Sequence, residues 1–196
     1  MELMKNKHPS LNKDVYFDTD CLSSFLLVEK TNILEKLFKR KIVIPEQVYA
    51  ELDKPAVRFL KAKLDDFIKR TDAKIQTVEI NSDEFNLYLG LTSGKNCKVI
   101  GKGEAICIAL AKIKDGLLAS NNLRDICRYI KQYNLEFITT GDILTMALQN
   151  EIITKQEGED IWQSMLKIKR KIGPSTFCEY LENFKNLNKQ NYFPCK

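Results

Sequence analysis

Short apolar stretches recur along the chain, and the intervals between them carry apolar residues at helical spacing. The apolar stretches predict strands at residues 14–18, 41–45, 73–80, 117–120 and 135–140. The spacing of three and four between apolar residues predicts helices at 23–40, 45–54, 56–70, 82–94, 103–113, 123–134 and 142–152. Strands that alternate with helices predict an α/β fold in which a parallel sheet lies between helical layers.

The pattern changes after residue 150, where no further strand is predicted. Two amphipathic helices, at 155–172 and 175–190, are separated by Gly173 and Pro174 and followed by a polar tail. We therefore expect one domain over residues 14–150 and a C-terminal helical extension over residues 151–196. The apolar residues of the extension suit packing on the domain, a dimer surface or a site for a partner segment equally well.

The composition excludes several classes of protein. In 196 residues the chain has no apolar run near the ~20 residues that span a bilayer, and its polar start lacks a signal-peptide core. These features predict a cytoplasmic protein with no membrane association. The six cysteines form no CxxC pair and are expected to be free thiols. His8 is the only histidine, which argues against histidine-based zinc sites and catalytic triads.

The charge is unevenly distributed along the sequence. The formal net charge is +5, and residues 36–74 contain eleven basic against six acidic residues. A basic surface favours a polyanionic partner such as nucleic acid, although a solvated lysine-rich helix explains the same count.

Polar residues follow the predicted strands at the points where they end. The carboxyl ends of parallel strands share one edge of the sheet, so the side chains found there converge. Asp18, Asn121–Asn122 and Thr139–Thr140 lie at strand ends. Glu51, on the helix that starts at Pro45, and Glu104, in the first turn of the helix predicted at 103–113, are expected to join them. Clustered carboxylates repel one another and therefore usually hold cations. Oxygen ligands without histidine or thiolate favour Mg²⁺ or Mn²⁺, which promote phosphodiester hydrolysis.

Each of these acids also has a simpler structural interpretation. Glu104 lies in the first turn of a helix, where the helix dipole stabilises a carboxylate. Asp18 is a candidate cap for the next helix, and Glu51 a solvated residue paired with Lys54. The remaining acids near strand ends, Asp20, Asp53 and Asp142, are interpreted as surface or capping residues, and Asp142 as the cap of the helix that follows it.

Four segments, in order, resemble the motif set of PIN-domain nucleases, in particular the toxin ribonucleases of the VapBC type. These segments are VYFDTDCLSSFL, IVIPEQVYAEL, GKGEAICIALAKIKDGLLASNNLRDI and FITTGDILTMAL, and together they cover roughly residues 14–150. The resemblance implies a parallel sheet of Rossmann-like topology flanked by helices. It also implies a metal-dependent endoribonuclease that leaves a 5′-phosphate and a 3′-hydroxyl, often dimeric and held by a cognate antitoxin.

The resemblance assigns roles to individual residues. The acids of the family match Asp18, Glu51, Glu104 and Asp125 as catalytic residues. The Mg²⁺ or Mn²⁺ ligands would be Asp18, Glu104, Asn122 and Asp125. Contacts to RNA are expected from Lys102 and from Ser120 and Thr139, whose hydroxyls are also candidates to support the site by hydrogen bonds.

Asn122 departs from the family, which usually has an aspartate at this position. An asparagine ligates a hard cation through its carbonyl oxygen but brings no negative charge, so metal affinity falls unless Asp125 compensates. Three histories explain an asparagine at this position. The aspartate was changed to silence a toxic nuclease, or the protein is a naturally weak enzyme, or it is an inactive member of the family.

Three functions therefore compete. The first is an active ribonuclease, the toxin of a toxin–antitoxin pair. The second is a PIN-like RNA-binding or protein-interaction module with weakened or lost activity. The third is a phosphatase similar to haloacid dehalogenases, suggested by Asp18 and Asp20 after a strand, but the following CLSSF does not provide the usual polar loop.

Overall fold

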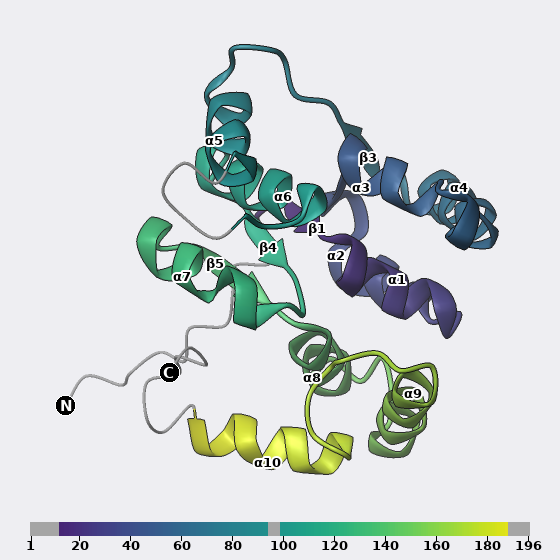
Figure 1. Ribbon diagram of the computed structural model, residues 1–196. Helices are drawn as coiled ribbons and strands as arrows, with labels where there is room; N and C mark the ends of the chain where they lie inside the picture. Colours follow the sequence, from purple (N-terminus) through teal and green to yellow (C-terminus); the bar gives the residue numbers. More distant parts are fainter. Residues whose placement is uncertain (1–11, 94–98, 188–196) are drawn as a thin grey trace.

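A five-stranded sheet forms the centre of the computed structural model, which describes residues 12–93 and 99–187 (Figure 1). The strands are β1 (Val15–Phe17), β2 (Ile42–Pro45), β3 (Lys74–Gln76), β4 (Leu117–Ala119) and β5 (Glu136–Ile138). All neighbouring strands pair in parallel, in the order β3-β2-β1-β4-β5. The predicted α/β fold with a parallel sheet is confirmed.

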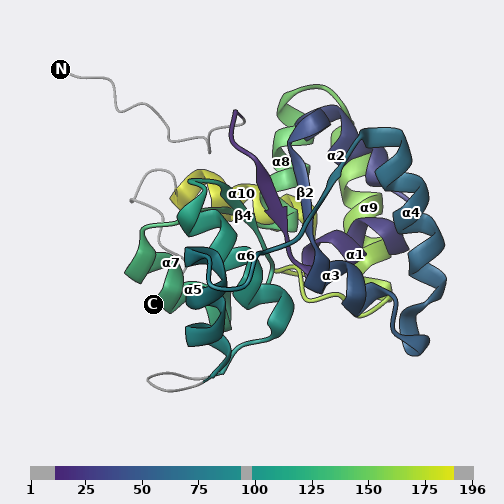
Figure 2. The same cartoon turned by 90° about the horizontal axis from the view of Figure 1, so that it is seen from above.

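Helices cover both faces of this sheet. They are α1 (Thr19–Leu27), α2 (Thr31–Phe38), α3 (Glu46–Leu52), α4 (Phe59–Thr71), α5 (Asp83–Thr92), α6 (Lys102–Ile113), α7 (Leu123–Tyr133), α8 (Thr140–Gln149), α9 (Lys155–Lys167) and α10 (Phe177–Leu187). Short 3₁₀ turns at Lys39–Lys41 and Pro55–Val57 complete the described elements. Figure 2 shows α5, α6 and α7 on one side of the strands and α1, α2 and α8 on the other.

The strand order reverses at β1, which lies between β2 and β4. The connection from β1 leads to β2 on one side, whereas β4 pairs with β1 on the other, with Val15 aligned with both Ile42 and Leu117. In open parallel sheets the crevice at such a reversal is the usual ligand site, because the two connections diverge there. A functional site is therefore expected at the carboxyl ends of β1 and β4.

Two predicted elements differ from the structure. The single helix predicted at 23–40 is two helices, because the chain turns at Glu29 with a left-handed φ of 57°. The first of them starts at Thr19, since the Asp18 side chain caps it. The strand predicted at 73–80 is limited to Lys74–Gln76 at the sheet edge, where only β2 provides a hydrogen-bonding partner.

One hydrophobic core extends through the described residues, including those after residue 150. Val15 and Phe17 of β1 are fully buried, and Trp162 of α9 and Phe177 of α10 belong to the same cluster. The Trp162 indole Nε1–H donates to the carbonyl of Pro174 at 3.0 Å. The division at residue 150 stays a prediction, and continuous packing crosses it.

The structure tests the expectation that the cysteines are free thiols, and it shows the lengths of the helices. Cys21 and Cys107 are buried free thiols and Cys178 is a half-buried one, as expected. Cys127 takes part in a disulfide bond, so the expectation is wrong for this residue, which lies on a half-exposed side of α7 rather than in the core. Cys97 and Cys195 lie outside the described residues. Among the described helices, none has the length and apolar character needed to cross a membrane.

Candidate active site

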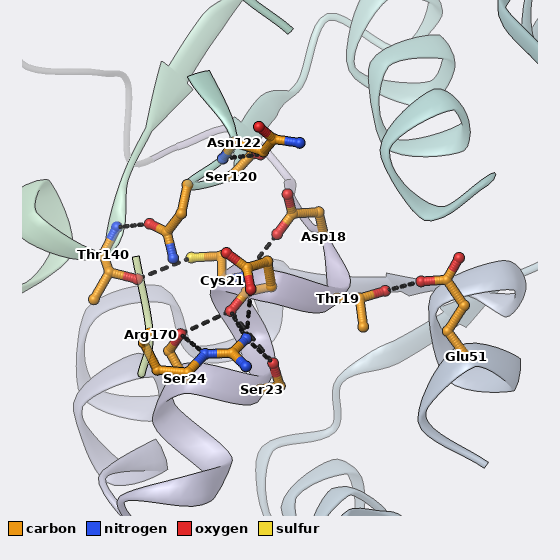
Figure 3. Close-up of polar contacts among 12 residues, drawn as sticks. Asp18, Thr19, Cys21, Ser23, Ser24, Glu51, Ser120, Asn122, Thr140 and Arg170 are labelled. Carbon is orange, nitrogen blue, oxygen red and sulfur yellow. Dashed lines mark hydrogen bonds and ion pairs between the residues drawn. The ribbon is translucent and has the colours of Figure 1, made fainter. Parts of the chain in front are cut away.

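Asp18 lies where β1 ends and α1 begins, at the reversal of the strand order. Its backbone N–H donates to the carbonyl of Ala119 in β4, and its Oδ1 caps α1 by accepting from the N–H of Cys21 at 2.7 Å. The side chain is buried, with 1% exposed, and Oδ2 has no hydrogen-bond partner (Figure 3). The pKa of Asp18 is raised to about 7, mainly by burial and to a smaller extent by the charges of Asp20 and Glu104, while hydrogen bonding from Ser120 and from the Cys21 N–H acts in the opposite direction. An unpaired buried carboxylate oxygen requires a proton or a cation.

Glu104, Asn122 and Asp125 form a hydrogen-bonded group beside Asp18. The Asn122 amide Nδ2 donates to Glu104 Oε1 at 2.5 Å and to Asp125 Oδ2 at 3.1 Å. Glu104 also accepts from the N–H of Gly101 at 3.3 Å, which places it in the first turn of α6. Burial raises the pKa of Glu104, while its hydrogen bond from Asn122 acts in the opposite direction. The asparagine thus links two carboxylates that would otherwise repel each other.

Glu51 reaches the same edge of the sheet from α3. Its carboxylate accepts from the hydroxyl of Thr19 and, at 3.1 Å, from the N–H of Gly103. A Cβ at Gly103 would lie 2.9 Å from Glu51 Oε2 and 3.0 Å from the Thr19 hydroxyl, so a larger residue here would displace the Glu51 carboxylate from its present position. The alternative in which Glu51 is a solvated residue paired with Lys54 does not hold, because Glu51 instead joins α1, α3 and α6.

The hydroxyls expected to contact RNA lie below the surface and support other groups. Ser120 is buried, and its Oγ accepts from the N–H of Asn122 at 3.3 Å. Thr139 is also buried and is the N-cap of α8, where its hydroxyl bonds to Asp142 at 2.8 Å. Lys102 is exposed, one residue before the Gly103 that contacts Glu51. Of the three expected RNA contacts, Lys102 is therefore the one on the surface.

Contacts of three residues at this edge were not expected from the sequence. Asn121 accepts from the N–H of Thr140 at 2.9 Å, while its own Nδ2 is buried and has no partner. The expectation that Asp142 caps α8 is wrong, since the cap is Thr139. Asp142 is the third residue of the capping box, and burial raises its pKa. Its second oxygen accepts from the Tyr180 hydroxyl of α10 at 2.9 Å. No local sequence signal marks this last contact.

Arg170, which follows α9, is the other missed residue. Its guanidinium bonds to the side chain of Asp20 at 2.5 Å and to the hydroxyls of Ser23 and Ser24 at 2.7 and 3.2 Å (Figure 3). Asp20 was interpreted as a surface or capping acid. It is partly exposed, but its charge acts on both Asp18 and Glu104.

The chemistry of these donors suits a hard cation. The buried Asp18 Oδ2 has no hydrogen-bond partner, and the charge of Glu104 acts on this carboxylate. Carboxylate oxygens are ligands that Mg²⁺ and Mn²⁺ prefer. In the residues that the structure describes, however, no three Asp, Glu, His or Cys side chains are already arranged as a metal centre. The Asn122 amide instead donates to both Glu104 and Asp125.

The fold and the site together define an α/β protein with acidic side chains at the strand-order reversal. A family model for DUF3368, described as a PIN domain, matches residues 14–186, so the chain belongs to this family of PIN-domain proteins. PIN domains are a nuclease-type fold, and their members are generally hydrolases. Neither the comparison with curated proteins nor the comparison with solved structures found a match.

Proposed function

We propose that this protein is a metal-dependent endoribonuclease that hydrolyses RNA phosphodiester bonds. The observation that carries the proposal is the buried, unpaired Asp18 Oδ2. The charge of Glu104 acts on Asp18, and that of Asp125 acts on Glu104. Membership of the PIN family supports the same chemistry. The net charge of +5 and the basic segment at 36–74 favour a polyanionic substrate.

Asp18, Glu104 and Asp125 would hold Mg²⁺ or Mn²⁺, with the amide of Asn122 as a neutral fourth group. When bound, such a cation lowers the pKa of a water molecule and offsets the charge that develops on the phosphate. The role of the chain is to orient these groups. The hydrogen bond from the Cys21 N–H fixes the side chain of Asp18, and the hydrogen bond from the Gly101 N–H fixes that of Glu104.

Glu51 has a different task in this mechanism. It is held by Thr19 and by the N–H of Gly103, on the α3 side of the site. There its bonds to Thr19 and Gly103 hold the first turns of α1 and α6, which carry Asp18 and Glu104, in fixed relative positions. Exposed Lys102 would contact a phosphate of the RNA strand next to the cleaved bond.

The biological setting that we propose follows from the resemblance to VapBC-type toxins. In that setting the chain is the cytoplasmic toxin of a toxin–antitoxin pair, held by a cognate antitoxin protein and able to form a homodimer. The C-terminal helices and the basic segment offer surfaces for these partners.

The geometry of Asn122 favours one alternative, a PIN-like RNA-binding or protein-interaction module with weakened or lost activity. Its amide already satisfies Glu104 and Asp125 by hydrogen bonds, so the acidic group is stable without a cation. RNA would then bind at the basic surface without being cleaved.

The decisive experiment is cleavage of single-stranded RNA with and without Mn²⁺. The proposal expects Mn²⁺-dependent cleavage that is lost in Glu104→Gln and increased in Asn122→Asp. Glu182→Gln is the matched control, because this glutamate is exposed on α10. Cleavage that survives in EDTA or in Glu104→Gln would refute the proposal. RNA binding without cleavage in both the parent chain and Asn122→Asp would establish the alternative.

A further inference from the structure

The turn after α9 directs one basic side chain back to the start of α1. Lys169 has a left-handed φ of 61°, and the N–H of Arg170 donates to the carbonyl of Met165 at 3.0 Å, which ends the helix. Lys169 and Lys171 on either side are exposed, whereas 21% of the Arg170 side chain is exposed. The turn therefore selects Arg170, among three consecutive basic residues, for contact with α1.

The guanidinium of Arg170 is held by four hydrogen bonds. The two hydrogens of Nη2 are shared among three acceptors, the Asp20 side chain at 2.5 Å, the Asp20 backbone carbonyl at 3.1 Å and the Ser23 hydroxyl at 2.7 Å. Nε donates to the Ser24 hydroxyl at 3.2 Å. Residues 20, 23 and 24 share one face of the helix because they are three and four positions apart. The planar guanidinium of arginine reaches several acceptors at fixed angles, which lysine does not.

The position of Asp20 matters because of what lies next to it. Asp18 is two residues away, and the Asp20 charge acts on both Asp18 and Glu104. A free Asp20 carboxylate would be a fourth acid at a site where Asp18, Glu104 and Asp125 already converge. An extra carboxylate binds a cation more tightly but also displaces it from the geometry that the reaction needs.

We propose that Arg170 is a positioning residue of the acidic site. It fixes the side chain of Asp20 on the Ser23–Ser24 face of α1 and so keeps this carboxylate out of the cation site. The proposal rests on the proposed function for the identity of the cation site, and it gives the segment after residue 150 a role in that site.

The test is an Mn²⁺ titration of the full chain, followed by electron paramagnetic resonance of free Mn²⁺. Arg170→Gln removes one positive charge and frees Asp20, so the Mn²⁺ affinity should rise about three- to tenfold, the range expected for a unit charge within roughly 10 Å. Asp20→Asn should lower the affinity by a similar factor. The double variant should return to the affinity of the parent chain.

Three comparisons separate positioning from simple structural support. Lys169→Gln is the matched control, since it removes a neighbouring exposed charge that does not contact α1. Arg170→Lys keeps the charge but not the four bonds, and should lie between the parent and Arg170→Gln. RNA cleavage should fall in Arg170→Gln although Mn²⁺ binds more tightly, a combination that loss of folding does not produce.

The outcomes are distinct. If Arg170→Gln binds Mn²⁺ as Lys169→Gln does, or more weakly without recovery in the double variant, the proposal is overturned. If the parent chain binds no Mn²⁺, the proposed function fails on its metal. A crystal structure of metal-free Arg170→Gln then decides the positioning role: Asp20 leaves its present rotamer if Arg170 sets it, and keeps that rotamer if the proposal is wrong.

Discussion

Asn122→Asp perturbs the centre of the acidic group and has a calculable effect on folding. The variant loses the two amide hydrogen bonds, at 2.5 and 3.1 Å, to Glu104 and Asp125. In a half-exposed setting each such bond contributes about 1 kcal/mol to stability. Two carboxylates about 4 Å apart repel by roughly 1–4 kcal/mol, depending on the effective dielectric constant.

Rotation of the new side chain and partial protonation relieve part of this repulsion. We expect a net loss of about 3 kcal/mol in the free energy of unfolding at pH 8 in EDTA, after allowing for this relief. For a chain of this size, that loss lowers the Tm by about 6–12 °C. A cation supplied at a hundred times its Kd would restore about 2.7 kcal/mol. Mg²⁺ should therefore stabilise Asn122→Asp much more than the parent chain.

The assay is thermal unfolding of both chains at pH 8, in EDTA and in 10 mM MgCl₂. Asn86→Asp is the control, because Asn86 is an exposed residue of α5 and tests the same chemical change away from the site. A variant that is as stable as this control in EDTA, or that gains nothing from Mg²⁺, would show that Asn122 does not replace a cation between the two carboxylates.

Three further variants test the site. Gly103→Ala places a methyl group 2.9 Å from Glu51 Oε2 and should lower RNA cleavage more than tenfold in an initial-rate assay. The pKa of Asp18 is about 7 in the folded chain, above the ordinary value of an aspartate. The folded chain therefore keeps a proton that the unfolded chain releases, and stability falls as the pH rises from about 4 to 7. Asp18→Asn removes this slope, so in urea unfolding with EDTA it should be more stable than the parent at pH 8, by up to roughly 4 kcal/mol, and similar at pH 4. Tyr180→Phe removes the hydroxyl that bonds to the half-buried Asp142 of α8, and should cost about 1–3 kcal/mol in the same unfolding assay.

Each of these variants has its own check. Gly90→Ala, with no atom within 4 Å of the added carbon, should leave cleavage intact and stabilise its helix by about 0.5–1 kcal/mol. Equal cleavage by the two alanine variants would remove the argument for a close approach at Gly103. If the free energy of unfolding of Asp18→Asn depends on pH in the same way as that of the parent, the Asp18 carboxyl is not protonated as assigned. An unchanged unfolding midpoint in Tyr180→Phe would mean that α10 docks through its aromatic ring alone.

The sequence predicted the parts of this fold that depend on local patterns. Four of the five strands were found near their observed limits, because buried parallel strands are short and strongly apolar. The convergence of Asp18 with Asn122 followed from the rule that parallel strands end at one edge. Glu51 and Glu104 were expected at the same edge, but their catalytic roles depended on the family resemblance, since a glutamate on a helix has no local mark of function.

The errors share one physical cause, which is that the deciding contact lies far away in sequence or depends on a single backbone angle. The break at Glu29 needs a left-handed φ that its residue type does not favour. Arg170 meets Asp20 across 150 positions, and Tyr180 meets Asp142 across 38. No periodicity within one element reports such pairs.

The separation between Asp20 and Arg170 also sets an order of events while the protein is made. Translation adds about 5–20 residues per second, so the arginine is joined to the growing polypeptide some 8–30 s after its aspartate. Throughout that interval the emerging chain carries early acids that still lack their late basic partner. A ribosome stalled between the codons for residues 140 and 170 would hold a chain that contains all five strands but still lacks the arginine that binds Asp20.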